Sequence, residues 1–139
     1  MGILTDFYAA PRASAEKILA GKAAKLPKVT SKGIDEVKLT SLDAIARKQL
    51  SAKGKPGEAT LLTDQDAEQW VFLVSPALVA LLARAGAKAG AIAKAWAATE
   101  EMKRDGWSPA ETKELVDQLV ALAATATKTK VDMLLWMSL

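Results

Sequence analysis

Residues 108–126 carry the clearest helical pattern of the chain. Apolar residues recur there at spacings of three and four, and the charged residues between them fall on other faces of a helix. The apolar stripe consists of Leu115, Val116, Leu119, Val120, Leu122 and Ala123. We therefore predict a long amphipathic helix over this segment, with its apolar stripe in the core.

Four more segments have helical character. Residues 11–21 begin with proline and end with glycine, and residues 40–50 place apolar side chains at helical spacing. Residues 76–85 follow a serine and begin with proline, and they are apolar around most of the circumference, which predicts a buried helix. Residues 87–105 are rich in alanine, which has the highest helix propensity, and are predicted to form one helix.

Three segments have the composition of strands. Residues 59–63 and 69–74 are rich in aliphatic, β-branched or aromatic side chains, and residues 64–68 between them predict a turn. Residues 131–139 predict a last, buried strand that could pair with residues 69–74. These patterns place at least part of the core between helices and a small sheet.

The remaining segments are interrupted by proline and glycine. Residues 22–33, which are rich in lysine, and residues 51–59 are predicted to be loops. Residues 34–39 fit either a strand or an early helical turn. We predict one mostly helical α+β domain over residues 1–139, with about four to five helices packed on a two- or three-stranded sheet.

A run of charged residues between two tryptophans predicts a tight corner between two helices. Gly106 is expected to end the alanine-rich helix in a left-handed conformation, with Met102 and Trp107 in apolar contact. Ser108 is expected to cap the next helix, and Glu111 three residues later completes a capping box. Every residue of this stretch thus has a structural interpretation.

The same stretch also offers a candidate binding site. On a continuous helix Trp96, Glu100 and Arg104 would share one face, where an aromatic ring, a carboxylate and a guanidinium could receive a polar ligand or a partner side chain. The structural alternative has Trp96 buried and the two charged residues paired at the exposed end of the helix.

The composition narrows the chemistry that is available. Half of the 139 residues are hydrophobic and a quarter are charged, as in ordinary globular domains. The chain has no cysteine and no histidine, which excludes disulfides and thiolate metal sites and removes the commonest acid–base group. We assign no catalytic residue, no metal ligand and no cofactor.

The charge is unevenly distributed along the chain. Residues 1–55 hold eleven basic and five acidic residues, and the net charge of the whole chain is +3. Candidate contacts to nucleic acid or another polyanion are lysines in the predicted loops: Lys22, Lys25, Lys28, Lys32, Lys53 and Lys55. Residues 13–69 contain no aromatic residue and a single arginine, which favours solvated loops over a nucleic-acid surface.

An enzyme is the remaining alternative. It would use Mg²⁺ on carboxylates or a buried lysine, and it requires a deep pocket lined by at least two of Glu100, Glu101, Asp105 and Lys94.

The chain begins without a secretory pattern, and its longest apolar run, residues 70–83, is too short to cross a bilayer. These features predict a soluble, cytoplasmic protein with no membrane partner.

Four short segments resemble a family of small bacterial proteins of unknown function. They are "MGILTDFY", "AWAATEE", "DGWSPAE" and "DMLLWMSL". The resemblance implies a bacterial, cytoplasmic setting but no activity, cofactor or partner. The leading functional hypothesis is a non-enzymatic interaction or regulatory domain that binds a protein partner or a second copy of itself.

Overall fold

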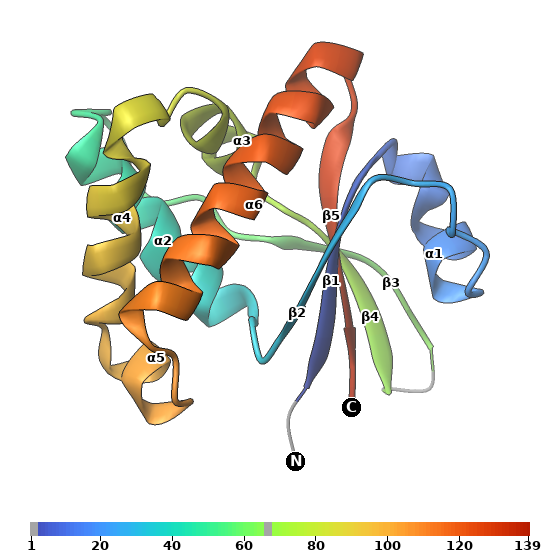
Figure 1. The fold of residues 1–139 in the computed structure, drawn as a ribbon. Helices are drawn as coiled ribbons and strands as arrows, with labels where there is room; N and C mark the ends of the chain where they lie inside the picture. The colour runs from blue at the N-terminus through green and yellow to red at the C-terminus, as the bar shows by residue number, and fades with distance from the viewer. Residues whose placement is uncertain (1–2, 66–67) are drawn as a thin grey trace.

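Five antiparallel strands form one sheet with the order β2-β1-β5-β4-β3 (Figure 1). The computed structural model describes residues 3–65 and 68–139. The strands are β1 (Leu4–Ala10), β2 (Lys28–Lys32), β3 (Thr60–Gln65), β4 (Gln69–Leu73) and β5 (Asp132–Ser138). The last strand therefore lies at the centre of the sheet, paired with β1 on one side and with β4 on the other.

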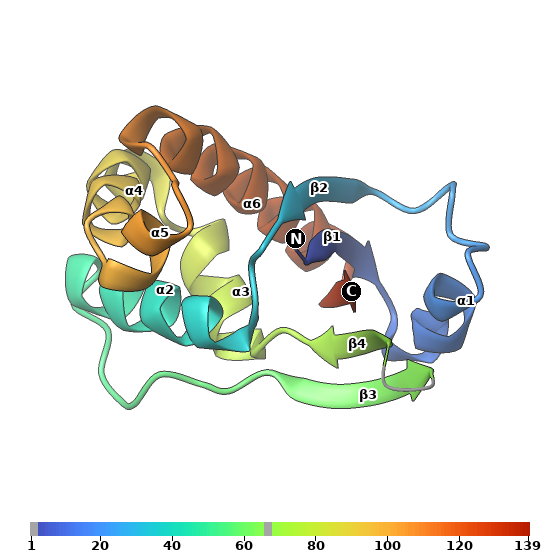
Figure 2. The ribbon, with the colours of Figure 1, turned by 90° about the horizontal axis from the view of Figure 1, so that it is seen from below.

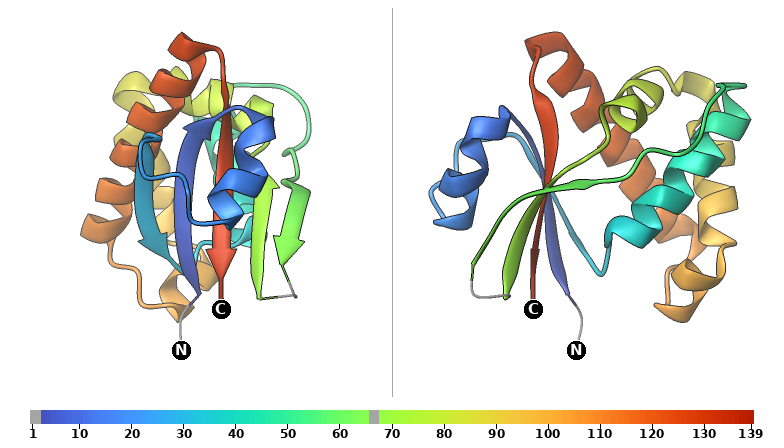
Figure 3. Two further views of the ribbon diagram at one scale, coloured as in Figure 1. Left: turned by 90° about the vertical axis from the view of Figure 1, so that its right-hand side faces the viewer. Right: turned by 180° about the vertical axis from the view of Figure 1, so that it is seen from behind.

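The helices cover the two faces of the sheet unequally. α1 (Ala15–Leu19) lies alone on one face, and the other helices lie on the opposite face (Figures 1 and 3). They are α2 (Glu36–Gln49), α3 (Pro76–Ala83), α4 (Ala89–Ala97), α5 (Glu100–Arg104) and α6 (Pro109–Thr129). Two short 3-10 turns, Arg12–Ser14 and Gly86–Lys88, precede α1 and α4.

The pleat of the strands divides the buried side chains between two cores. Phe7 and Leu135 point toward the larger group of helices, whereas their neighbours Tyr8 and Leu134 point toward α1. This alternation follows from the period of two along a strand. Both faces of the central strands are therefore covered, although α1 protects a smaller area than the helices opposite.

The predicted α+β class is confirmed, and the predicted size of the sheet is wrong. The described residues form five strands and six α-helices, where the sequence predicted two or three strands and four to five helices. The predicted pairing of β5 with β4 is confirmed, and the two predicted strands over residues 59–63 and 69–74 are present as β3 and β4, which pair antiparallel. Residues 64 and 65, predicted to lie in the turn, belong to β3. Residues 66 and 67 of the predicted turn lie outside the described residues.

Two segments account for the additional strands. The predicted loop over residues 22–33 contains β2, which pairs with β1 in a regular antiparallel register. The segment before residue 11, where no element was predicted, contains β1 itself. Residues 36–39 belong to α2, whose N-cap Asp35 accepts a hydrogen bond from the backbone N–H of Lys38 at 2.9 Å. The alternative of a strand at residues 34–39 is thereby wrong.

The alanine-rich segment is not one helix. α4 ends at Ala97, and Thr99 adopts an extended conformation before α5 begins. The hydroxyl of Thr99 donates to the carbonyl of Trp96 at 2.7 Å, which satisfies a carbonyl at the end of α4. The break turns α5 away from α4, so that residues expected on one helix lie on two.

The predicted corner between α5 and α6 is confirmed. Gly106 has φ +79°, its N–H bonds to the carbonyl of Lys103, and the N–H of Trp107 bonds to the carbonyl of Met102, both at 3.0 Å. This is the Schellman pattern. Ser108 and Glu111 form the predicted capping box at the start of α6.

A buried carboxylate holds the loop after α2. Asp43 is fully buried; its Oδ1 accepts from Nε of Arg47 at 2.6 Å, and its Oδ2 accepts from the backbone N–H of Gly57 at 3.0 Å. Arg47 also donates to the carbonyl of Lys53 at 2.8 Å. Asp43 therefore ties residues 53–57 to α2.

The described residues contain no single helix that is both long and apolar enough to cross a membrane. α3 and the segment Gly86–Ala97 reach the required length and composition only when taken together, and their axes meet at 99°.

Candidate partner-binding groove

The outer edge of β2 presents backbone groups that are not bonded to any of the strands in the described part of the chain. The N–H of Ala9 bonds to the carbonyl of Pro27, and the N–H of Gly33 bonds to the carbonyl of Ile3. In an antiparallel ladder every second residue bonds to the neighbouring strand. Residues 27, 29, 31 and 33 therefore face β1, and the N–H and C=O groups of residues 28, 30 and 32 point outward.

The other edge of the sheet is less regular. β3 shifts register against β4 between Leu61 and Thr63, which marks a β-bulge. Bulges and lysines are the usual features that protect a sheet edge from pairing with another chain. β2 has no bulge, because its register with β1 does not shift, but it carries the other protective feature, with a lysine at each of its ends.

α6 extends beside this edge of the sheet (Figures 2 and 3), and the hollows between β2 and α6 form a groove. It consists of two open hollows of about 460 and 560 Å³ that share Thr30 and Gln118. The first is lined by Leu4, Ser31, Leu115 and the α6 glutamates Glu111 and Glu114 among others, and the second by Pro27, Val29 and Leu122 among others. The groove thus combines an apolar floor with the polar edge of a strand.

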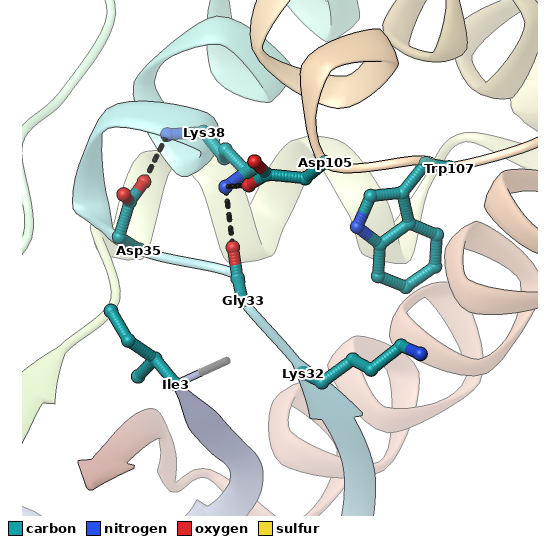
Figure 4. Close-up of a pocket in the computed structure, with 7 residues that line it drawn as sticks. All are labelled: Ile3, Lys32, Gly33, Asp35, Lys38, Asp105 and Trp107. Atoms are coloured by element: carbon teal, nitrogen blue, oxygen red, sulfur yellow. Dashed lines mark hydrogen bonds and ion pairs between the residues drawn. The ribbon is translucent and has the colours of Figure 1, made fainter. Parts of the chain in front are cut away.

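A third hollow of about 420 Å³ continues the groove past the end of β2 (Figure 4). It shares Lys32 and Trp107 with the neighbouring hollow and is also lined by Ile3, Gly33, Asp35, Lys38 and Asp105. The residue before β1, the β2–α2 turn, the start of α2 and the α5–α6 corner therefore meet at this end. The indole of Trp107 forms a shared wall of the two hollows.

Lys38 fixes the shape of this end. Its side chain is 6% exposed, and its ammonium donates to the carbonyl of Gly33 at 2.5 Å and to the carboxylate of Asp105 (Figure 4). Gly33 has φ +68°, a conformation that glycine adopts without strain. The lysine thus holds the turn after β2 against the corner before α6. The carbonyl of Gly33 and the carboxylate of Asp105 already bind this lysine in the absence of a partner.

Ser41 and Glu101 form a second link between α2 and α5. The hydroxyl of Ser41 donates to the carboxylate of Glu101, and this hydrogen bond is the main cause that lowers the pKa of Glu101 below its ordinary value. Weaker contributions come from the charges of Arg104 and Lys38. The ionised form of Glu101 is therefore the form that the folded protein stabilises.

Replacing Ser41 with alanine is expected to raise the pKa of Glu101 toward that of an ordinary glutamate. A carboxyl with a lowered pKa in the folded state contributes stability above its unfolded pKa and loses it as the pH falls through the folded value. The wild type should therefore lose more stability on acidification than Ser41→Ala. An NMR titration of the Glu101 carboxyl and urea unfolding at several acidic pH values measure both effects, with Glu101→Gln as the control that no longer titrates.

The structure separates the three residues of the predicted ligand site. Trp96 is fully buried on α4, whereas Glu100 and Arg104 are exposed on α5 beyond the break at Thr99. The burial of Trp96 agrees with the structural alternative. The ion pairs found among residues 3–65 and 68–139 do not include Glu100 with Arg104.

The candidate lysines fall into different segments. Lys28 and Lys32 lie on β2 and border the groove, and Lys22 and Lys25 precede them in the loop after α1. Lys53 and Lys55 belong to the loop after α2, which reaches the sheet at its opposite edge (Figure 2). These six lysines therefore do not form one continuous basic surface.

The structure also bears on the pocket expected for an enzyme, and it shows where large hydrophobic side chains are exposed. Of Glu100, Glu101, Asp105 and Lys94, only Asp105 lines the hollow beside Trp107. Within the described residues, no group of three acidic side chains lies close enough to hold a metal ion. The large hydrophobic side chains exposed there are Leu4, Val37, Leu61 and Leu139, and none of these is on the alanine-rich α4.

Sequence reasoning missed the residues that build the groove. Thr30, Trp107 and Gln118 were not candidates. Thr30 lies between the candidate lysines of a predicted loop, and Trp107 and Gln118 had structural interpretations in a helix ending and a helix. One available signal was the alternation of exposed and half-buried positions in "KVTSK", which is the pattern of an edge strand.

Comparisons with protein families, curated proteins and solved structures gave no match for this chain.

Proposed function

We propose that this protein is a non-enzymatic interaction domain, and that its partner binds in the groove between β2 and α6. The observation that carries the proposal is the regular, unpaired edge of β2 beside hollows that share Thr30 and Gln118. An exposed strand edge is a template for another chain. Open hollows in a row suit an extended segment of a partner better than a small molecule, which favours an enclosed cavity.

The charged side chains at the end of the groove, which bind one another or the backbone within this chain, support the same proposal. Lys38 and Asp105 neutralise each other, and Asp35 is engaged as the N-cap of α2. The side chain of Lys38 is 6% exposed, and its ammonium binds the carbonyl of Gly33 and the carboxylate of Asp105. The pair therefore holds the walls of the groove in position.

Position-specific cross-linking in cells of the source organism tests this proposal. A photoreactive phenylalanine analogue at Gln118, which lines both hollows, is expected to give a protein adduct of defined mass. The matched control is the same analogue at Ala124, which is exposed on the same helix and lines neither hollow. Equal adducts at both positions, or none at Gln118, would contradict a partner site in the groove.

A further inference from the structure

We infer that the groove binds an extended acidic segment of another protein, which adds to the sheet as a sixth strand beside β2. This inference rests on the proposed interaction function and specifies the conformation and the chemistry of the partner. The backbone of β2 supplies the first argument. The outward N–H and C=O groups of residues 28, 30 and 32 repeat over about 13 Å, at the spacing that a further strand requires.

The charges at the ends of β2 select the partner. Lys28 and Lys32 are exposed, lie four residues apart and point to the same side of the sheet. In the described part of the chain, neither lysine has an ion-pair partner within 4.0 Å. Asp6 is the acidic neighbour on this face, opposite Thr30, and on this face it leaves the two lysines with an excess of positive charge. Glu111 and Glu114 line the same hollow as Lys32 but belong to α6, which faces the other side of β2.

The same charges disfavour a second copy of this chain as the added strand. Two copies of β2 paired antiparallel in full overlap would centre on Thr30 and place Lys28 of each copy opposite Lys32 of the other. Like charges directly opposite one another across two strands are destabilising, whereas opposite charges are favourable. The edge therefore favours acidic residues on a different chain.

The side of β2 that faces α6 determines which partner residues fit between the two acidic residues. Val29 packs against the larger core, so the partner residues opposite Val29 and Ser31 point toward α6 and the hollows beside Leu115 and Leu122. Apolar side chains fit these two positions. The expected pattern is acidic–apolar–any–apolar–acidic. It reads the same in both directions and so holds for a parallel or an antiparallel partner.

Selection from a displayed library of random peptides tests this inference. The wild-type protein is expected to enrich peptides with two acidic residues four apart and apolar residues at the second and fourth positions. The double variant Lys28→Glu with Lys32→Glu should instead enrich basic residues at the acidic positions. The matched control Lys22→Glu with Lys25→Glu carries the same change of charge off the strand and should select the wild-type pattern.

Thr30→Pro tests the hydrogen bonds of the edge. The N–H of Thr30 points away from β1, and proline is tolerated at such a position of an edge strand, so the variant should fold normally by circular dichroism. Removing the central donor should weaken binding of the enriched peptides by about tenfold or more. Gln118→Trp, which narrows the groove, should also weaken binding, whereas Ala124→Trp should not.

The outcomes separate the inference from the function on which it rests. Two results would overturn strand addition and leave the interaction function intact, provided that Gln118→Trp still weakens binding. One is enrichment of peptides whose apolar residues have helical spacing, and the other is binding that Thr30→Pro does not change. If the double variant Lys28→Glu with Lys32→Glu still enriches peptides with the two acidic residues, the inference that these lysines select an acidic partner is overturned. If no peptide is enriched over the support alone, strand addition and the groove as a partner site both fail.

Discussion

Replacing Asp43 with alanine is expected to lower the free energy of unfolding by about 3–5 kcal/mol, because it removes one partner from a buried ion pair. The side chain of Arg47 is only 13% exposed, and its guanidinium would lose the carboxylate that lies 2.6 Å from Nε. The N–H of Gly57 would lose its acceptor as well. Urea unfolding of the two proteins at neutral pH measures the difference.

Asp117 provides a matched control for this experiment. It forms an ion pair with Lys113 that has the same sequence separation of four and the same length of 2.6 Å, but both side chains are 49% exposed. Asp117→Ala should cost no more than about 0.5 kcal/mol, since water screens and replaces an exposed pair. Equal losses for the two variants would contradict the role assigned to burial. Asp43→Asn keeps an acceptor for the N–H of Gly57, so its loss of unfolding free energy should lie between the losses of Asp43→Ala and Asp117→Ala.

Replacing Trp96 with alanine should have a comparable effect, a loss of about 3–5 kcal/mol through the cavity that it leaves. The indole is fully buried in the larger core, where α4 packs between α2 and α6. A loss below about 1 kcal/mol would be typical of a surface position and would contradict this placement. Urea unfolding again measures the change.

The indole nitrogen of Trp96 adds a second test at this position. Its Nε1 is buried and has no hydrogen-bond partner among the described residues, a situation that costs roughly 1–3 kcal/mol. Trp96→Phe removes this N–H and should therefore be clearly less destabilising than Trp96→Ala. In Trp136, by contrast, Nε1 donates to Gln69 at 2.9 Å. Trp136→Phe therefore breaks a hydrogen bond and does not relieve an unsatisfied N–H group.

Three of the strands and most of the helices could be predicted from local patterns, whereas the break that separates α4 from α5 could not. α6 was recognisable because its apolar stripe and its capping box agree on the same helix. β4 and β5 were recognisable because dense apolar runs suit strands covered on both faces. In these segments the local pattern and the tertiary environment require the same residues.

β1 and β2 were missed for different physical reasons. In β1, Phe7 and Tyr8 are buried on opposite faces, and the fully buried Thr5 adds a polar residue, so no alternating pattern remains. In β2, the flanking lysines that mark an edge strand also suggest a solvated loop. The groove depends on both strands and on the register between them, which no local pattern contains. Its residues could not be assembled before the topology was known.

The position of β5 between β1 and β4 has a consequence for the synthesis of this protein on the ribosome. β1 and β2 can pair early, and β3 and β4 can pair later, but only residues 132–138 connect the two pairs. Contacts between residues 4–10 and 132–138 span almost the whole chain and are among the slowest to form. A nascent chain interrupted before residue 132 keeps the sequence of four strands, yet it has no strand to join them into a sheet.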